Sequence, residues 1–152
     1  YARDMSGALG LAVEVVDSPE KAVRNLDLVV TSGPILEHPK PTIKAGWLAK
    51  GAFASAVDYD SYWDGAALAE ADKISTDDKA QMAYTRGVGY FQNTPEPYAD
   101  LGEIVAGKKP GRESRDERNI AINLGLALDD MATAPLVLKR AREKGIGVEL
   151  PL

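Results

Sequence analysis

The sequence contains no cysteine and only one histidine, His38, among its 152 residues. Without thiols the chain has no disulfide, no cysteine nucleophile and no cysteine-type zinc site. A single histidine also excludes metal sites and mechanisms that need two. Because His38 lies between Glu37 and Pro39 in a proline-rich stretch, we interpret it as an exposed loop residue. The lack of cysteine fits our expectation of a cytoplasmic protein.

Long basic runs and long apolar runs are missing as well. The net charge is −5, from 18 Lys and Arg against 23 Asp and Glu. An acidic chain without a basic block is a poor ligand for nucleic acid or an anionic membrane surface, so we expect neither partner. No apolar run approaches the ~20 residues of a membrane-spanning helix.

The residues that are present suit one globular domain, with 45% hydrophobic and 27% charged side chains. A chain of this length buries roughly 68–70% of its unfolded surface on folding. Residues 1–10 (YARDMSGALG) read as the last turns of a helix that ends at a glycine. We therefore expect the sequence to start inside a structural element and to be a fragment.

Short apolar runs alternate with helix and turn signals, which indicates an α/β fold with a mostly parallel sheet and flanking helices. Strands are expected at 11–16, 26–33, 51–57, 73–76 and 119–124, and helices at about 18–25, 78–86, 99–106 and 125–144. The last of these is a long C-terminal helix, and Pro135 inside it predicts a kink.

No segment carries the G-x-G-x-x-G fingerprint of a dinucleotide phosphate loop. Residues 7–12 (GALGLA) lack the spacing and precede a strand, and residues 87–89 (GVG) follow a helix. From spacing alone the sequence names no nucleotide.

Two strand ends carry the polar residues that chemistry would need. In open α/β sheets, ligands bind outside the carboxyl ends of the strands. The first end is Thr31-Ser32-Gly33, and the second lies within residues 56–64 (AVDYDSYWD), which hold three aspartates. Small hydroxyl residues and glycine let a ligand approach the backbone, and a carboxylate beside it can act as a general acid or base. The alternative is that both ends are ordinary turns, which aspartate favours.

Four segments together resemble the ornithine cyclodeaminase/mu-crystallin family. Residues 99–112 (ADLGEIVAGKKPGR) resemble its L-G-E-[IV]-[VI]-x-G-x-x-x-G-R segment, and residues 123–134 (NLGLALDDMATA) resemble its S-x-G-x-A-x-[EQ]-D-x-A-T-A segment. Residues 17–31 are similar to D-S-x-E-E-A-V … A-D-I-V-V-T, and residues 51–60 to G-x-x-x-N-A-V-G-x-D. The ordered match runs from about residue 9 to residue 147.

The resemblance implies a Rossmann-type domain that binds NAD or NADP and supports hydride transfer at an amino acid or an imine. It implies a homo-oligomer and, in full-length members, a separate N-terminal domain for substrate binding. Residues 1–124 would form a partial dinucleotide-binding domain that lacks the first strand and the glycine loop. Residues 125–152 would hold the C-terminal helix, which in the family packs back toward the N-terminal domain.

The resemblance also assigns roles to individual residues. The catalytic aspartate of the family falls on Asp60, which would move a proton at the substrate nitrogen or an attacking water. Cofactor-binding roles fall on Thr31, Ser32 and Gly33 beside the nicotinamide ribose, on Ser55, Val57 and Asp58 at the nicotinamide side, and on Asn123. No metal site is implied.

Several of these positions depart from the family pattern, because residues 31–34 (TSGP) replace the usual T-A-T and residues 55–58 (SAVD) replace N-A-V-G. Asp58 stands where most members have glycine, and Asn123 stands where many have serine. With the glycine loop and the substrate-binding residues expected before Tyr1, we expect this chain alone to be inactive and to bind cofactor weakly or not at all. The alternative is a non-catalytic nucleotide-binding or scaffold domain of the same fold. A metal or sugar site at residues 56–64 ranks below both, because the D-x-[DN]-x-[DN]-G pattern is missing.

Overall fold

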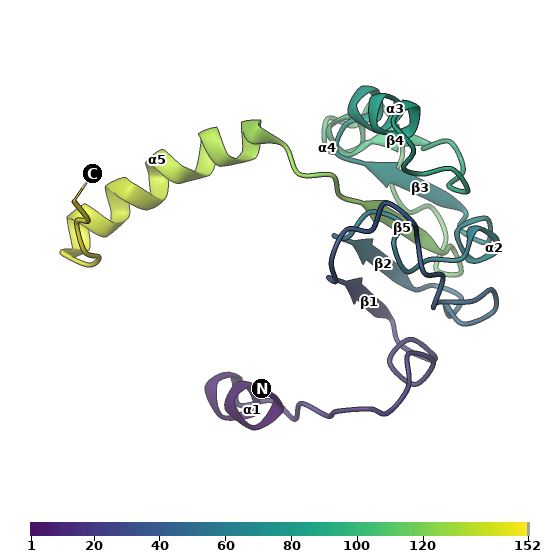
Figure 1. Cartoon of the computed structure of the whole chain (residues 1–152), viewed down its shortest axis with the longest axis horizontal. Helices are drawn as coiled ribbons and strands as arrows, with labels where there is room; N and C mark the ends of the chain where they lie inside the picture. Colours follow the sequence, from purple (N-terminus) through teal and green to yellow (C-terminus); the bar gives the residue numbers. More distant parts are fainter. Residues whose placement is uncertain (152) are drawn as a thin grey trace.

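Five strands form one sheet at the centre of the protein in a computed structural model, which describes residues 1–151 (Figure 1). The strands are β1 (Leu28–Thr31), β2 (Phe53–Ala56), β3 (Lys73–Thr76), β4 (Ala99–Asp100) and β5 (Asn119–Ile122). Their order across the sheet is β1-β2-β5-β3-β4, and every neighbouring pair is parallel. The expected α/β architecture is confirmed.

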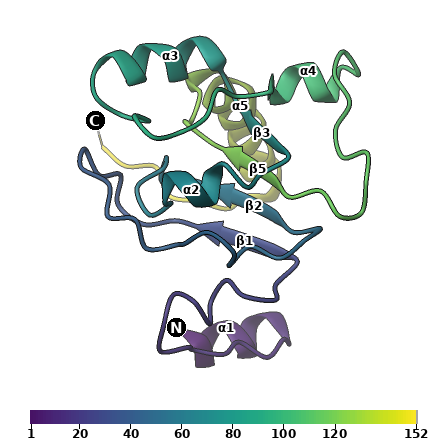
Figure 2. The same cartoon turned by 90° about the vertical axis from the view of Figure 1, so that its right-hand side faces the viewer.

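One face of the sheet carries the hydrophobic core. Ala54, Ile74 and Ile120 are in register across the three central strands and are at most 4% exposed. They pack in one cluster with large side chains from the connecting segments, which include Trp63, Leu68, Met82 and Phe91. Figure 2 shows α2 lying in front of the strands on the covered side.

The helices are α1 (Ala2–Leu9), α2 (Gly65–Leu68), α3 (Lys79–Gly87), α4 (Leu101–Val105) and α5 (Ala127–Lys144). Aspartates precede three of them: the Asp64 carboxylate accepts from Ala66 N, the Asp78 carboxylate accepts from Gln81 N, and Asp100 precedes α4. Asp64 therefore has the capping role that is typical of aspartate at a turn. Within residues 1–151, no helix combines the length and apolarity needed to cross a membrane.

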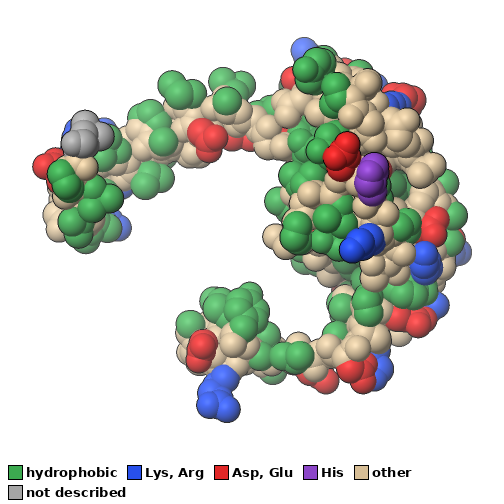
Figure 3. All heavy atoms as spheres, in the orientation of Figure 1, with side chains coloured by type: hydrophobic (Ala, Val, Ile, Leu, Met, Phe, Trp, Pro, Cys, Tyr) green, Lys and Arg blue, Asp and Glu red, His purple; other side chains and the backbone are tan. Residues whose placement is uncertain are grey.

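The two terminal helices project from the sheet toward the same side (Figure 1). Neither α1 nor α5 contains a buried residue, and α5 runs through Pro135. The space-filling view shows hydrophobic side chains on α5 and on the surface of the sheet that borders the hollow between the two helices (Figure 3). On edge strand β1, Leu28 and Val30 are 70% and 66% exposed, so the β1 end of this face has no cover within the described residues.

Three expected elements differ from the structure. Residues 11–16 form no strand, because they pair with no neighbour among the described residues that could fill their backbone hydrogen bonds. Residues 18–25 form turns instead of a helix, and Asn25 ends them in the left-handed region with φ 61°. The helix expected at 99–106 begins with β4, because Ala99 and Asp100 pair with Ser75 and Thr76.

Candidate functional site

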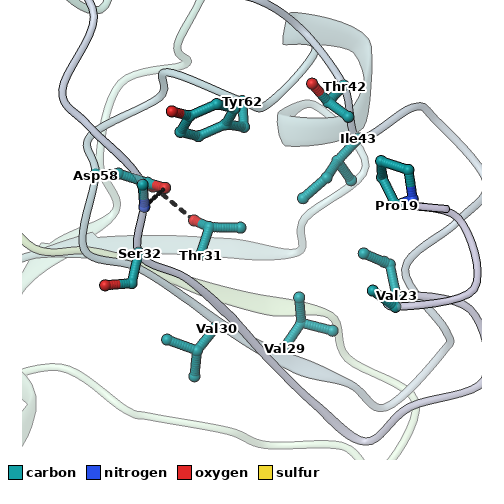
Figure 4. Close-up of a pocket in the computed structure, with 12 residues that line it drawn as sticks. Pro19, Val23, Val29, Val30, Thr31, Ser32, Thr42, Ile43, Asp58 and Tyr62 are labelled. Atoms are coloured by element: carbon teal, nitrogen blue, oxygen red, sulfur yellow. Dashed lines mark hydrogen bonds between the residues drawn. The ribbon is translucent and has the colours of Figure 1, made fainter. Parts of the chain in front are cut away.

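A cavity of about 360 Å³ opens beside the carboxyl ends of β1 and β2. Its lining combines the turn at Pro19–Val23, strand β1 with the three residues 31–33, and the side chains of Thr42, Ile43, Asp58 and Tyr62 (Figure 4). Four predicted residues, Thr31, Ser32, Gly33 and Asp58, meet there although 25 residues separate Gly33 from Asp58 in sequence. The parallel pairing of β1 with β2 explains this, because it brings both carboxyl ends to one edge of the sheet.

The Asp58 carboxylate holds the end of β1 in place. Its Oδ1 accepts a hydrogen bond from Thr31 Oγ1 at 2.6 Å, and its Oδ2 accepts from Gly33 N at 2.9 Å (Figure 4). Thr31 Oγ1 also accepts from Trp63 Nε1 at 3.2 Å. Because the indole N–H can only donate, the Thr31 hydroxyl proton is left to point at Asp58, which fixes the direction of the whole network.

Tyr62 and Gly33 form the second close contact at the cavity. A Cβ added to Gly33 would lie 2.5–2.7 Å from two ring carbons and the hydroxyl oxygen of Tyr62, so this side chain occupies space that only glycine leaves free. The Tyr62 hydroxyl donates to the Pro34 carbonyl at 3.2 Å. The aromatic side chain is therefore fixed across the loop that follows β1.

The other predicted cofactor residues lie outside this cavity. Ser55 alternates with the buried Ala54 and Ala56, so its side chain points to the opposite face of the sheet. There Asn123 Nδ2 donates to Ser55 Oγ at 2.9 Å, and Val57, half exposed, follows at the end of β2. The structure thus separates the predicted cofactor residues into a group that lines the cavity and a second group, Ser55, Val57 and Asn123, that lies outside it.

Asp60, the predicted catalytic residue, is buried and does not line the cavity. It is 4% exposed, and its Oδ2 accepts from Thr94 Oγ1 at 2.9 Å. Its Oδ1 has no hydrogen-bond partner among the described residues. Burial raises the pKa of the Asp60 carboxyl above its ordinary value, and the hydrogen bond from Thr94 works against this rise.

The backbone between the two aspartates explains why they diverge. Tyr59 has φ 60°, a left-handed conformation that is uncommon for a residue with a large side chain. Its ring packs against Phe91 and Tyr90, with centroids 4.8 Å and 5.5 Å away, which offsets the cost of that conformation. Asp58 is left facing the end of β1, and Asp60 faces Thr94.

Several lining residues were not predicted from the sequence. Tyr62, Thr42 and Ile43 reach the cavity from loops, and Thr94 reaches Asp60 across 34 positions of sequence. No local pattern signals such contacts, since each depends on the path of a long loop. Among residues 1–151, no group of three His, Asp or Glu side chains has the arrangement of a metal site.

The lining chemistry fits one end of a dinucleotide better than the other. None of the 12 lining residues is Lys, Arg or His, so nothing in the cavity neutralises a phosphate. Hydroxyl groups of Thr31, Ser32 and Thr42 stand among apolar side chains such as Val29 and Ile43. This combination fits an uncharged or cationic ring with its ribose.

Comparison with known proteins places these observations in a family. Alanine dehydrogenase of Archaeoglobus fulgidus is 31% identical over 147 residues, which cover 87% of this chain and 42% of that protein. The solved structure of Thermococcus litoralis Delta(1)-pyrroline-2-carboxylate reductase in complex with NADH and L-proline is 28% identical, with a TM-score of 0.74, and covers 98% of this chain and 48% of that one. An archaeal alanine dehydrogenase dimer with bound NAD is 29% identical with a TM-score of 0.70, over 98% of this chain and 48% of that one.

The chain therefore spans less than half the length of these relatives. The family profile of the ornithine cyclodeaminases and mu-crystallins matches residues 1–145. The parallel sheet, the strand-end residues and a match over nearly the whole sequence agree: the chain belongs to the ornithine cyclodeaminase/mu-crystallin family.

Proposed function

We propose that this chain is the C-terminal portion of an NAD(P)-dependent, ornithine cyclodeaminase-like oxidoreductase or deaminase that acts on an amino acid or an imine. The observation that carries the proposal is the cavity at the carboxyl ends of β1 and β2, which gathers Thr31, Ser32, Gly33 and Asp58. Relatives that are named dehydrogenases and reductases, and the NADH and NAD in two related structures, support it.

The cavity would hold the nicotinamide end of the cofactor, which accepts or donates a hydride when it is bound. The Thr31 and Ser32 side chains would contact the ribose, and Gly33 would let it approach the backbone. Three further residues would contact the cofactor from the other side of the same sheet edge: Ser55, Val57 and Asn123. The phosphates would need donors that this cavity lacks, so we expect the chain alone to bind cofactor weakly and to be inactive.

Asp60 would hold and transfer the proton at the substrate nitrogen or at an attacking water. Thr94 occupies its Oδ2, which leaves Oδ1 as the oxygen without a partner in the described residues. The raised pKa of the Asp60 carboxyl supports this role, because an acid–base group works best when its pKa is close to the working pH.

Cofactor binding is tested by titrating NADH and NADPH into the chain and following the fluorescence of the reduced nicotinamide. The same titration on a longer natural protein that contains this sequence gives the reference affinity. Saturable binding to the longer protein, weakened in the chain alone, is the expected result. If the longer protein shows no saturable binding of either cofactor, the proposal is wrong.

Turnover is tested in the longer protein with Delta(1)-pyrroline-2-carboxylate and NADH, and with L-alanine or L-proline and NAD. Asp60→Asn is expected to lower kcat by about 100-fold or more, the usual contribution of a general acid or base. Asp64→Asn is the matched control, because it makes the same change four residues away at a partly exposed helix cap. If Asp60→Asn leaves turnover at the level of the control, Asp60 has no catalytic role.

We also propose that the protein is a homo-oligomer. Leu28 and Val30 on an edge strand and the exposed apolar residues of α5 support self-association, since large apolar patches mark interaction surfaces. One related structure is described as a dimer. Light scattering across a dilution series tests this, and a monomer at every concentration would contradict it.

A further inference from the structure

Asp58 is a buried carboxylate without a counter-charge. Its side chain is 0% exposed, and it takes part in no ion pair within residues 1–151. Both of its oxygens accept hydrogen bonds, from Thr31 Oγ1 and from Gly33 N. Trp63 Nε1 donates to Thr31 Oγ1, so the Thr31 hydroxyl donates toward Asp58. Asp58 thus only accepts hydrogen bonds in this network, as an ionised carboxylate does.

The charge of Asp58 faces a cavity that supplies no positive side chain of its own. The lining is otherwise apolar or hydroxylic. Burying a charge is costly unless an opposite charge accompanies it. Two hydrogen bonds compensate part of that cost, and a positively charged ligand in the cavity would compensate the rest.

We infer that this cavity binds a cationic organic group, for which Asp58 supplies the counter-charge. The inference deepens the proposed function and rests on it where the cation is the oxidised nicotinamide ring of the cofactor. A protonated amine or iminium group has the same chemistry and is the other source. Anionic groups such as phosphates and carboxylates are selected against at this position.

One consequence distinguishes the two redox states of the cofactor. The nicotinamide ring carries a positive charge when it is oxidised and none when it is reduced. A carboxylate at the cavity therefore strengthens binding of NAD⁺ relative to NADH. Such a preference suits a site that takes up the oxidised cofactor in order to oxidise an amine. It also identifies Asp58, at a position where the family pattern has glycine, as a specificity-determining residue.

The test measures the dissociation constants of NAD⁺ and NADH by titration calorimetry, for the longer natural protein that contains this sequence and for its Asp58→Asn variant. Asp58→Asn removes one unit charge at close range in a partly screened site, and it is expected to raise the dissociation constant of NAD⁺ roughly tenfold or more. Binding of NADH is expected to change less than twofold. Asp64→Asn is the control for charge and side-chain chemistry, since Asp64 lies in the same stretch, is paired with Lys44 and is away from the cavity. It is expected to change neither constant.

A second arm uses n-butylammonium and n-butanol, which are similar in size and differ in charge. It distinguishes an amine from the nicotinamide ring as the source of the cation. In one outcome, neither cofactor form binds, butylammonium binds more tightly than butanol, and Asp58→Asn abolishes this difference in affinity. The inference then stands, and the cofactor proposal for this cavity fails. If NAD⁺ and NADH bind and the variant changes both equally, the cofactor proposal stands and the inference is overturned.

Folding of the variant is checked by circular dichroism, because Asp58→Asn replaces one of the two accepting oxygens with an amide NH₂ group, which can only donate. If Asp58→Asn does not fold, the wild-type pairs decide the question. Tighter binding of the cation than of its neutral counterpart in either pair supports the inference. Equal affinities, or no binding of any of the four ligands, overturn it.

Discussion

Replacing Thr31 with valine should destabilise the fold strongly although the two side chains have the same shape. The change removes the hydroxyl that donates to Asp58 Oδ1 at 2.6 Å and accepts from Trp63 Nε1 at 3.2 Å. Asp58 and Trp63 are 0% and 2% exposed, so a valine side chain in place of the hydroxyl leaves both groups short of a hydrogen bond. A hydrogen bond to a charged group contributes about 1.5–3 kcal/mol, and an unsatisfied buried donor costs about 1–3 kcal/mol.

The expected loss is therefore about 2.5–6 kcal/mol in the free energy of unfolding, from a total that is about 5–15 kcal/mol for a typical domain. Urea unfolding followed by tryptophan fluorescence measures it, and a slope of about 2 kcal/mol per molar urea converts the loss into a midpoint shift of about 2 M. Thr31→Ser is the matched control, because it keeps the hydroxyl and loses one methyl group, at a cost of about 0.8 kcal/mol. If valine is tolerated as well as serine, the hydroxyl does not hold this network together.

Three further predictions concern the same region. Asp60→Asn is expected to raise stability at neutral pH, because burial raises the pKa of the Asp60 carboxyl and the charged form therefore disfavours the folded state. The folded protein binds the Asp60 proton more tightly than the unfolded chain does, so the wild type gains stability as the pH falls from above the folded-state pKa toward about 3.9. The difference in unfolding free energy between the wild type and Asp60→Asn therefore shrinks over this pH window. Urea titrations that show a constant difference across the window would contradict the assignment. Leu68→Ala, at a position 0% exposed, is expected to cost about 2–5 kcal/mol and Leu68→Met less than about 1.5 kcal/mol, and equal losses in thermal melts would count against a tightly packed core there. Gly33→Ala places a Cβ against the Tyr62 ring and is expected to lower the free energy of unfolding by about 1–3 kcal/mol, and by less in a Tyr62→Ala background. A double-mutant cycle that shows no coupling between the two positions would mean that the ring is not the obstacle.

Most of the sheet could be predicted from local sequence. Lys73–Thr76 was expected as a strand and is β3 over the same residues, and the runs before Thr31 and Ala56 contain β1 and β2. Short apolar runs bounded by turn residues carry this information. Residues 11–16 have the same kind of pattern but form no strand, because pairing depends on a neighbour that is remote in sequence.

The residues at the strand ends were also predictable, but their arrangement was not. The rule that ligands bind at the carboxyl ends of parallel strands selects Thr31, Ser32, Gly33 and Asp58, which do line one cavity. The same rule treats Asp58 and Asp60 alike. The left-handed turn at Tyr59 separates them, and it depends on packing against Phe91, 32 positions away.

The sequence by itself determined the fold class, the family and the stretch that carries the polar groups, because these depend on local patterns and on the order of motifs. Only the tertiary structure decided that Asp58 closes a hydrogen-bond chain with Thr31 and Trp63, and that Tyr62 packs against Gly33. Only the tertiary structure left Asp58 without a counter-charge beside a cavity. The physical reason is that burial and pairing of a charge depend on which distant segments the folded chain brings into contact with it.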